Sequence, residues 1–198
     1  MSLQLAKNPA RTVPARVPRK LRGEIQRVLI SKPAIAQRVR QLSREINREF
    51  AGRELVVVAV LNGTIMFIAD LIRHLELPLR LDFIGCSSYG LGTAPGAFVF
   101  TKELRLDVKG RDVLLVDDIL DTGRTLMRVV TKIEQLNPRR IKTCVLLEKA
   151  ARRVENIEAD YVGFNIPDLF VVGYGLDYAE RYRNLPFVGV LHDRMYHS

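Results

Sequence analysis

The sequence lacks any apolar run that approaches the ~20 residues needed by a membrane-spanning helix. Its N-terminus also lacks the apolar stretch of a secretory signal. These absences argue against a membrane or secreted protein, so we expect a cytoplasmic one. The composition agrees, because 47% hydrophobic and 27% charged residues are typical of a soluble globular protein. A length of 198 residues suits one domain with a substantial core.

Cysteine is scarce in this chain. The two that occur, Cys86 and Cys144, both fall in apolar segments that look like strands. Two isolated thiols provide neither a disulfide framework nor the spacing of a metal site. We therefore expect both to be free, buried thiols, as is usual in a cytosolic protein.

Acidic residues are absent from residues 1–23. This segment holds six of the 31 basic residues and none of the 22 acidic ones, so it carries most of the net charge of +9. It also contains three prolines and little to bury, which predicts a disordered or loosely docked tail before a domain of residues 24–198. The alternative is a polybasic arm that binds RNA or an acidic partner.

Two common nucleotide-binding motifs, GxxxxGK[ST] and GxGxxG, are missing as well. In their place, residues 113–126 read Val-Leu-Leu-Val-Asp-Asp-Ile-Leu-Asp-Thr-Gly-Arg-Thr-Leu. Residues 113–116 are apolar without alternation, as in a parallel strand buried on both faces. Asp117 and Asp118 follow where that strand should emerge at its C-terminal edge, which is the edge where open α/β sheets bind ligands.

The next residues, 121–125, form a turn of small and hydroxyl side chains that leads into an amphipathic helical run over 126–136. Backbone N–H groups at a helix N-terminus, a glycine and two threonine hydroxyls together make a phosphate cradle. Carboxylates beside such a cradle indicate a sugar phosphate, with the acids on its hydroxyls or on a divalent cation. The alternative is a surface turn, which is disfavoured because paired acids after a buried strand are costly without partners.

A second strand, loop and helix repeat this arrangement. Residues 55–61 form an uninterrupted apolar strand, Asn62-Gly63-Thr64 turns, and a strongly apolar helix is predicted over 65–75. Apolar spacing also predicts a helix over 33–50 with Ser31 as its N-cap. Further strands are expected over 81–86, 97–101 and 142–147. The alternation predicts an α/β fold with a doubly wound, mostly parallel sheet flanked by helices.

Residues 113–126 closely resemble the motif of the phosphoribosyltransferases, the enzymes that use phosphoribosyl pyrophosphate (PRPP). From about residue 24 onward the chain is similar to their hypoxanthine-guanine branch. The resemblance implies the type I phosphoribosyltransferase fold, with a small hood subdomain over the purine. It implies transfer of the phosphoribosyl group to hypoxanthine and guanine in purine salvage, giving IMP or GMP and pyrophosphate.

The same resemblance implies roles for the residues of the central motif. The loop that binds the 5′-phosphate consists of Asp121, Thr122, Gly123, Arg124 and Thr125. Asp117 and Asp118 face the ribose hydroxyls, and Asp121 is the general base or acid. Asp177, with Asp117 and Asp118, is matched to the Mg²⁺ site, since that hard cation prefers carboxylate and phosphate oxygens.

Residues outside the motif are matched to the leaving group, pyrophosphate, and to the incoming purine. Those for pyrophosphate are Leu61, Asn62, Gly63 and Arg183, and those for the purine are Lys149, Phe170 and Val171. A non-proline cis peptide is implied between Leu61 and Asn62. The chain departs from the family pattern at Asn62, where many members have Lys or Arg. Lys149 can only donate hydrogen bonds, so it suits a 6-oxo group and opposes a 6-amino group. Ser88 and Tyr89 match the start of a lid over PRPP.

The resemblance implies PRPP and a purine base as partners, and a homodimer or homotetramer. We do not expect a nucleic acid or a membrane as a partner. Three alternatives remain: a phosphoribosyltransferase that prefers xanthine, an RNA-binding regulator built on the same fold, and a protein that binds PRPP without turnover. The basic tail motivates the regulator, whereas Lys149, Phe170 and Asp177 argue against it.

Overall fold

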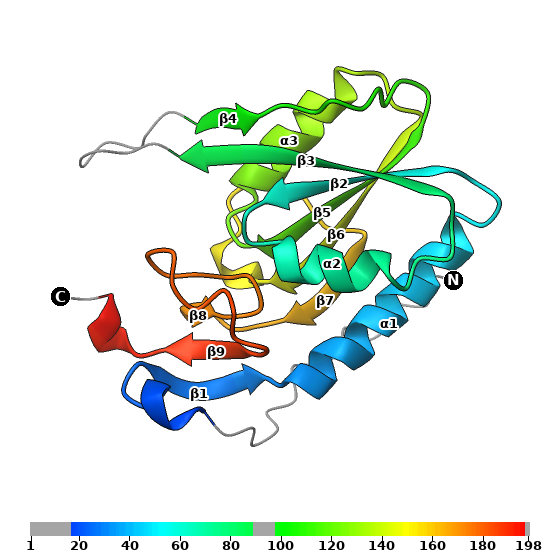
Figure 1. The fold of residues 1–198 in the computed structure, drawn as a ribbon. Helices are drawn as coiled ribbons and strands as arrows, with labels where there is room; N and C mark the ends of the chain where they lie inside the picture. Colours follow the sequence, from blue (N-terminus) through cyan, green and yellow to red (C-terminus); the bar gives the residue numbers. More distant parts are fainter. Residues whose placement is uncertain (1–16, 89–97, 197–198) are drawn as a thin grey trace.

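The computed structural model describes residues 17–88 and 98–196. Its main body is a six-stranded sheet in the order β4-β3-β2-β5-β6-β7, shown in Figure 1. All neighbouring strands are parallel except β3 and β4. The strands are β2 (Leu55–Leu61), β3 (Leu79–Ser88), β4 (Phe98–Lys102), β5 (Asp112–Leu120), β6 (Arg140–Glu148) and β7 (Tyr161–Asn165). The doubly wound, mostly parallel sheet that the sequence predicts is therefore confirmed.

Helices cover both faces of this sheet, and the sequence of β2 shows why. Its side chains alternate between two buried clusters: Val57 and Ala59 belong to one, Val56 and Val58 to the other. The first cluster contains the apolar faces of α1 (Lys32–Glu49) and α2 (Ile65–Ile72), and the second that of α3 (Arg124–Glu134). A strand buried on both faces needs apolar residues at every position, which is what β2 has.

The helix boundaries follow local signals in the sequence. The Ser31 hydroxyl accepts a hydrogen bond from the Ala34 N–H and caps α1, with a proline in the first turn, as predicted. Helix α2 ends at Ile72, three residues before the predicted end. The reason is a tighter turn, in which the N–H groups of His74 and Leu75 bond to carbonyls three residues earlier.

Strand β5 is longer than its apolar run, and this corrects one prediction about the acids. Its pairing with β2 stops at Ala59↔Val116, but its pairing with β6 continues to Leu120↔Glu148. Asp117 and Asp118 consequently lie inside β5 and not after it. Both still lie beyond the last residue pair of β2 and β5, so the acids face the open end of the sheet.

A smaller antiparallel sheet in the order β1-β9-β8 forms the hood that the resemblance implies. It joins β1 (Ile25–Ile30), from near the start of the chain, to β8 (Val171–Val172) and β9 (Val188–Leu191). Its own core is extended by Val17 and Leu21, and Leu21 ends the short helix η1 (Arg19–Leu21). The remaining single-turn helices of the described ranges are η2 (Ala150–Arg152) and η3 (Asp193–Met195).

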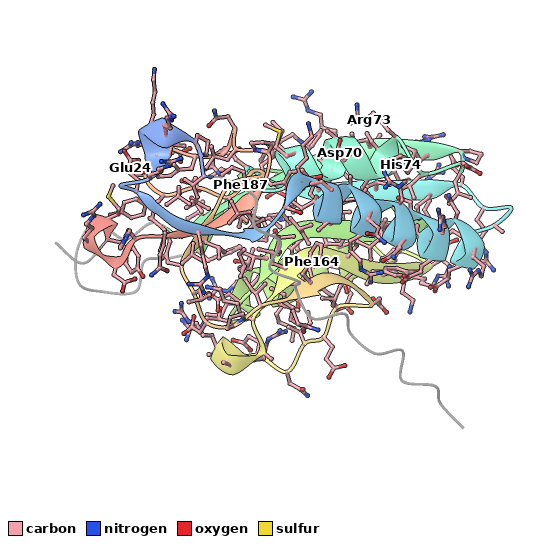
Figure 2. All side chains as sticks on the ribbon, turned by 90° about the horizontal axis from the view of Figure 1, so that it is seen from below. Glu24, Asp70, Arg73, His74, Phe164 and Phe187 are labelled. Carbon is pink, nitrogen blue, oxygen red and sulfur yellow. The ribbon has the colours of Figure 1, made fainter. Side chains whose placement is uncertain are left out.

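Polar contacts hold the hood together and join it to the main body. Glu24 accepts hydrogen bonds from the Tyr182 hydroxyl and, at 2.9 Å, from Arg181. The Tyr174 hydroxyl donates to Asp70 of α2 at 2.7 Å. Figure 2 shows Glu24 at the hood end of the molecule and Asp70 on α2. The first contact therefore lies within the hood, and the second joins the hood to α2.

Both cysteines are free, as predicted, but only Cys144 is buried. Cys86 is half-buried, because its strand β3 ends at the open edge of the sheet. No helix within residues 17–88 and 98–196 is both long and apolar enough to cross a membrane. The predicted tail lies mostly in residues 1–16, outside the described residues.

Candidate active site

A cavity of about 260 Å³ opens where β2 and β5 end. Its walls combine carboxylates, a threonine-rich loop and a few apolar side chains. The residues that line it are Val60, Leu61, Gly63, Cys86, Asp117, Asp118, Ile119, Leu120, Asp121, Thr122, Gly123, Thr125 and Leu126. Eight of the residues predicted from the sequence thus meet in one hollow at the expected edge of the sheet: both acids of the pair, four residues of the loop, and Leu61 and Gly63.

The acid pair forms the floor of this cavity. The Asp117 side chain is buried, and its carboxylate accepts the Asp118 N–H at 2.9 Å, while that of Asp118 accepts the Ile119 N–H at 2.8 Å. Burial and the adjacent Asp118 charge raise the pKa of Asp117 well above its usual range, and burial also raises the pKa of Asp118. Hydroxyl donors or a cation would stabilise such a pair.

The loop between β5 and α3 has the geometry of an anion site. Gly123 has φ +87°, and a Cβ there would lie 2.9 Å from Ile157 Cγ2, so glycine is required. The first bond of α3 runs from Met127 N–H to the Gly123 carbonyl at 2.9 Å. The amide groups that precede it have no carbonyl partner within the helix, and that of Arg124 donates to the Thr122 hydroxyl at 3.4 Å. Amide groups at a helix N-terminus favour the binding of an anion. Arg124 is exposed and adds a cation at the same end of the helix.

Asp121 begins this loop, and its carboxylate is only partly satisfied. One oxygen, Oδ2, lies 3.5 Å from Arg152 Nη1. The other, Oδ1, is buried and has no hydrogen-bond partner among the described residues. A buried carboxylate oxygen without a donor is costly, and a ligand that carries a proton would satisfy it. Asp121 Oδ1 can therefore accept a hydrogen bond from a molecule in the cavity.

The loop after β2 also lines the cavity, through Leu61 and Gly63. The peptide bond between Leu61 and Asn62 is cis, as the resemblance implies. Gly63 touches the acid pair so closely that a Cβ there would lie 1.6 Å from Asp118 Oδ2. A Cβ on Gly175 of the hood would in turn lie 2.0 Å from the Gly63 carbonyl oxygen. These two glycines allow the acid pair, the loop and the hood to pack in direct contact. Asn62, the other residue predicted in this loop, is exposed.

The hood presents an ion pair beside this loop. Arg183 Nη1 lies 2.9 Å from Asp177 Oδ1 and also donates to the Gly175 carbonyl at 2.8 Å. The charge of Arg183 also acts on Asp118, where it opposes the rise in pKa caused by burial. Neither Asp177 nor Arg183 lines the 260 Å³ cavity, so the structure brings them to its neighbourhood and not into its wall.

The three residues predicted for the purine come from β8 and from the segments that follow β6 and precede β8. Lys149 is buried, and its N–H donates to the Leu120 carbonyl at 2.9 Å, which fixes it beside the loop. Phe170 is 36% exposed and stacks on Tyr196 with ring centroids 4.6 Å apart. Val171 is buried in β8 and pairs with Val190. None of the three lines the 260 Å³ cavity.

Sequence reasoning missed several residues of the site. Cys86 lines the cavity, and burial together with Asp117 and Asp118 raises its pKa to about 11, so it stays protonated at neutral pH. Tyr196 and Arg152 contact Phe170 and Asp121, but nothing in their local sequence indicates this. Ser88 ends β3, and Tyr89 lies outside the described residues.

The acids of the site can hold a metal ion only together with a ligand. Among the described residues, no group of three or more His, Cys, Asp or Glu side chains is placed to bind a metal by itself. One or two of the carboxylates still fit Mg²⁺, because that ion commonly uses one or two carboxylates and completes its shell with substrate phosphates and water.

The fold and the cavity together define a class of protein. The sheet is mostly parallel, its central strand β5 carries paired acids near its carboxyl end, and a glycine loop then leads into α3. Such an arrangement suits a phosphorylated sugar. Comparison with known families agrees, because residues 28–179 match the phosphoribosyl transferase domain. The chain belongs to the phosphoribosyltransferase family and, within it, to the hypoxanthine-guanine phosphoribosyltransferases.

Individual relatives are similar along almost the whole chain. The hypoxanthine-guanine phosphoribosyltransferase of Bacillus subtilis is 44% identical over 179 residues, which is 90% of this chain and 99% of the relative. The bifunctional protein TilS/HprT of Listeria monocytogenes is 47% identical over 177 residues, 89% of this chain, but this chain matches only 27% of that longer relative. A hypoxanthine phosphoribosyltransferase structure from Staphylococcus aureus has a TM-score of 0.86 and 37% identity, covering 91% and 99% of the two chains.

Proposed function

We propose that this protein transfers the 5-phosphoribosyl group of PRPP to N9 of hypoxanthine or guanine in purine salvage. The bond between C1′ and the pyrophosphate oxygen breaks, the bond between C1′ and N9 forms, and the purine loses one proton. The observation that carries the proposal is the single cavity that joins the acid pair to the phosphate loop at the end of β5. The relatives' names supply the purine bases.

PRPP would lie along the cavity with its 5′-phosphate on the loop of residues 121–125. The backbone N–H groups at the start of α3 and the Thr122 and Thr125 hydroxyls are the donors for it. Asp117 and Asp118 would accept hydrogen bonds from the ribose hydroxyls and stabilise positive charge that develops on the sugar. The pyrophosphate would face Leu61, Asn62 and Gly63, with Arg183 of the hood on its other side.

The purine would lie between the hood and Lys149. A lysine ammonium only donates, so it can bond to a 6-oxo group but meets the 6-amino group of adenine donor to donor. Phe170 keeps part of its ring exposed for stacking, which contributes on the order of 1–3 kcal/mol per base and tolerates either purine. The backbone of Val171 would read the edge of the base.

Asp121 would accept the proton that the purine loses at N7, with the unpartnered Oδ1 as the accepting atom. Mg²⁺ bound by Asp177, with Asp117 and Asp118, would neutralise charge on the pyrophosphate. Much of the rate enhancement would then come from positioning and charge stabilisation.

Further parts of the proposal concern the whole protein. Residues 24–198 would form the transferase domain behind a basic tail, and Ser88 and Tyr89 would begin a lid that excludes water. A homodimer or homotetramer is proposed, with the exposed Ile65 and Met66 of α2 as candidate contacts. A cytoplasmic location is supported by the two free thiols.

The test is nucleotide formation from PRPP and Mg²⁺ with hypoxanthine, guanine, xanthine, adenine and uracil side by side. The proposal expects turnover of hypoxanthine and guanine, with adenine and uracil refused. Faster turnover of xanthine would make it the preferred base instead. No turnover of any base, while PRPP still binds, would contradict a transferase and favour the RNA-binding regulator.

A further inference from the structure

Arg152 lies between two carboxylates that belong to different parts of the site. Its Nη1 atom is 3.5 Å from Asp121 Oδ2 and 3.8 Å from Asp168 Oδ1. Asp168 Oδ1 is in turn 3.6 Å from Lys149 Nζ. Four charges of alternating sign therefore form a chain of ion pairs from Asp121 through Arg152 and Asp168 to Lys149.

The backbone fixes the two ends of this chain of ion pairs. The Lys149 N–H donates to the Leu120 carbonyl at 2.9 Å, and the Val154 and Glu155 N–H groups donate to the Thr122 carbonyl at 2.9 and 3.0 Å. The segment 149–155 consequently wraps around the phosphate loop. Because both ends of this segment are held by main-chain bonds, Arg152 extends from a segment whose position relative to Asp121 is already set.

Arg152 does not hold the segment together, unlike its neighbour Arg153. Arg153 is largely buried and donates to Glu148 at 3.0 Å and to the Ile157 carbonyl at 2.6 Å, so it holds the segment together. The Arg152 side chain is 50% exposed, and its polar contacts within the described part of the chain are the two ion pairs. An exposed ion pair adds little stability, which leaves positioning as the effect that Arg152 can have.

We propose that Arg152 is a positioning residue that orients Asp121 and, through Asp168, the ammonium group of Lys149. By holding Asp121 at Oδ2, it leaves Oδ1 free for the purine proton. By pairing with Asp168, it holds that carboxylate where it orients the Lys149 ammonium group. This inference rests on the proposed function.

The test uses the full chain with PRPP, Mg²⁺ and hypoxanthine, and it compares Arg152→Ala, Arg152→Lys, Asp168→Asn and the double variant Arg152→Ala/Asp168→Asn. The matched control is Arg80→Ala, because Arg80 is 51% exposed and pairs with Glu54 at 2.8 Å far from the cavity. The measurements are kcat, the KM of each substrate and the melting temperature.

Arg152→Ala should lower kcat about tenfold or more, since a small misplacement of a catalytic group is costly, while the KM of PRPP and the melting temperature stay unchanged. Asp168→Asn should raise the KM of hypoxanthine several-fold. The double variant should lose less than the product of the two single losses, because the residues act as a unit. Arg152→Lys should recover part of kcat, and Arg80→Ala should match the unmodified protein.

Wild-type kcat in Arg152→Ala, or a loss that accompanies a lower melting temperature and is not repaired by lysine, would overturn the inference. Independent, multiplicative losses in the double variant would also overturn it. Turnover by the unmodified protein separates the two hypotheses. If it is absent, the proposed function fails and this inference with it; if it is present and Arg152→Ala is equally active, only the inference fails.

Discussion

The buried carboxylate of Asp117 is a cost to the fold that only the function explains. It lies beside Asp118, and burial and that neighbour raise its pKa well above the usual range. A protein under selection for stability alone would not place two acids there, since two like charges in a buried site oppose ionisation. At the residue scale, the acid pair is therefore the clearest indication of a ligand-binding site.

Replacing Asp117 by Asn should separate stability from activity. We expect Asp117→Asn to raise the free energy of unfolding by about 1 kcal/mol at neutral pH and to lower turnover sharply. Because the folded-state pKa is raised, the wild-type carboxyl favours folding below its ordinary pKa, and this contribution is lost as pH rises through the folded-state pKa. The advantage of the variant should therefore grow with pH.

Denaturant unfolding across pH 4 to about 8, together with an activity assay, checks this prediction. A variant that is less stable than the wild type at neutral pH would show that the acid pair is structurally satisfied and would contradict the account.

At the scale of the element, periodicity and uninterrupted apolar runs were sufficient to predict β2, β5, β6 and α1. The ends of strands and helices were harder to predict, because they depend on the elements that pair or pack with them. Strand β5 runs on through Asp117 and Asp118 since β6 continues to pair with it, and no local pattern in β5 indicates that. The loop residues of the site followed from their motif, whereas Arg152 and Tyr196 come close only through tertiary packing.

The contact between the loop after β2 and the hood gives a test at the same scale. Gly175 has φ +103°, and a Cβ there would lie 2.0 Å from the Gly63 carbonyl oxygen. Gly175→Ala should force the hood away from the loop, destabilise the fold by about 1–3 kcal/mol and raise the KM of PRPP. Steady-state kinetics and thermal unfolding measure both effects.

Gly52→Ala is the matched control for this substitution. Gly52 also has a positive φ, +73°, but a Cβ added there would have no atom of the described residues within 4 Å. It should cost about 1 kcal/mol of stability and leave both KM values unchanged. Equal kinetic effects of the two substitutions would mean that backbone strain, and not the contact between loop and hood, is responsible.

On the scale of the whole molecule, the site exists because distant parts of the chain meet. The main sheet carries the acid pair and leads into the loop of residues 121–125. The hood, built from β1, β8 and β9, carries Phe170, Asp177 and Arg183, to which we assign the purine and the pyrophosphate. Glu24 joins two parts of the hood by accepting hydrogen bonds from Tyr182 and Arg181. Burial, and secondly the hydrogen bond to Glu24, raise the pKa of Tyr182 to about 12. Base binding should therefore depend on a residue that touches no substrate.

Glu24→Ala should leave the buried Tyr182 hydroxyl without its partner, at a cost of about 1–2 kcal/mol. The hood should loosen, so the KM of hypoxanthine should rise several-fold while the KM of PRPP changes little. Glu103→Ala is the control, because Glu103 also pairs with a cation, Lys132, at 2.8 Å but lies on the surface. An unchanged KM for hypoxanthine in Glu24→Ala would argue against a base site in the hood.

The central claim is that the cavity at the end of β5 binds PRPP and that Asp121 handles the proton of the purine. The most direct measurement is kcat for hypoxanthine in Asp121→Asn, with the Kd of PRPP measured on the same sample and with Asp107→Asn, an exposed turn residue, as the control. The account predicts a fall in kcat of about 100-fold with an unchanged Kd and full activity in the control. A kcat within about threefold of the wild type would contradict the assignment of Asp121 as the proton-transfer group.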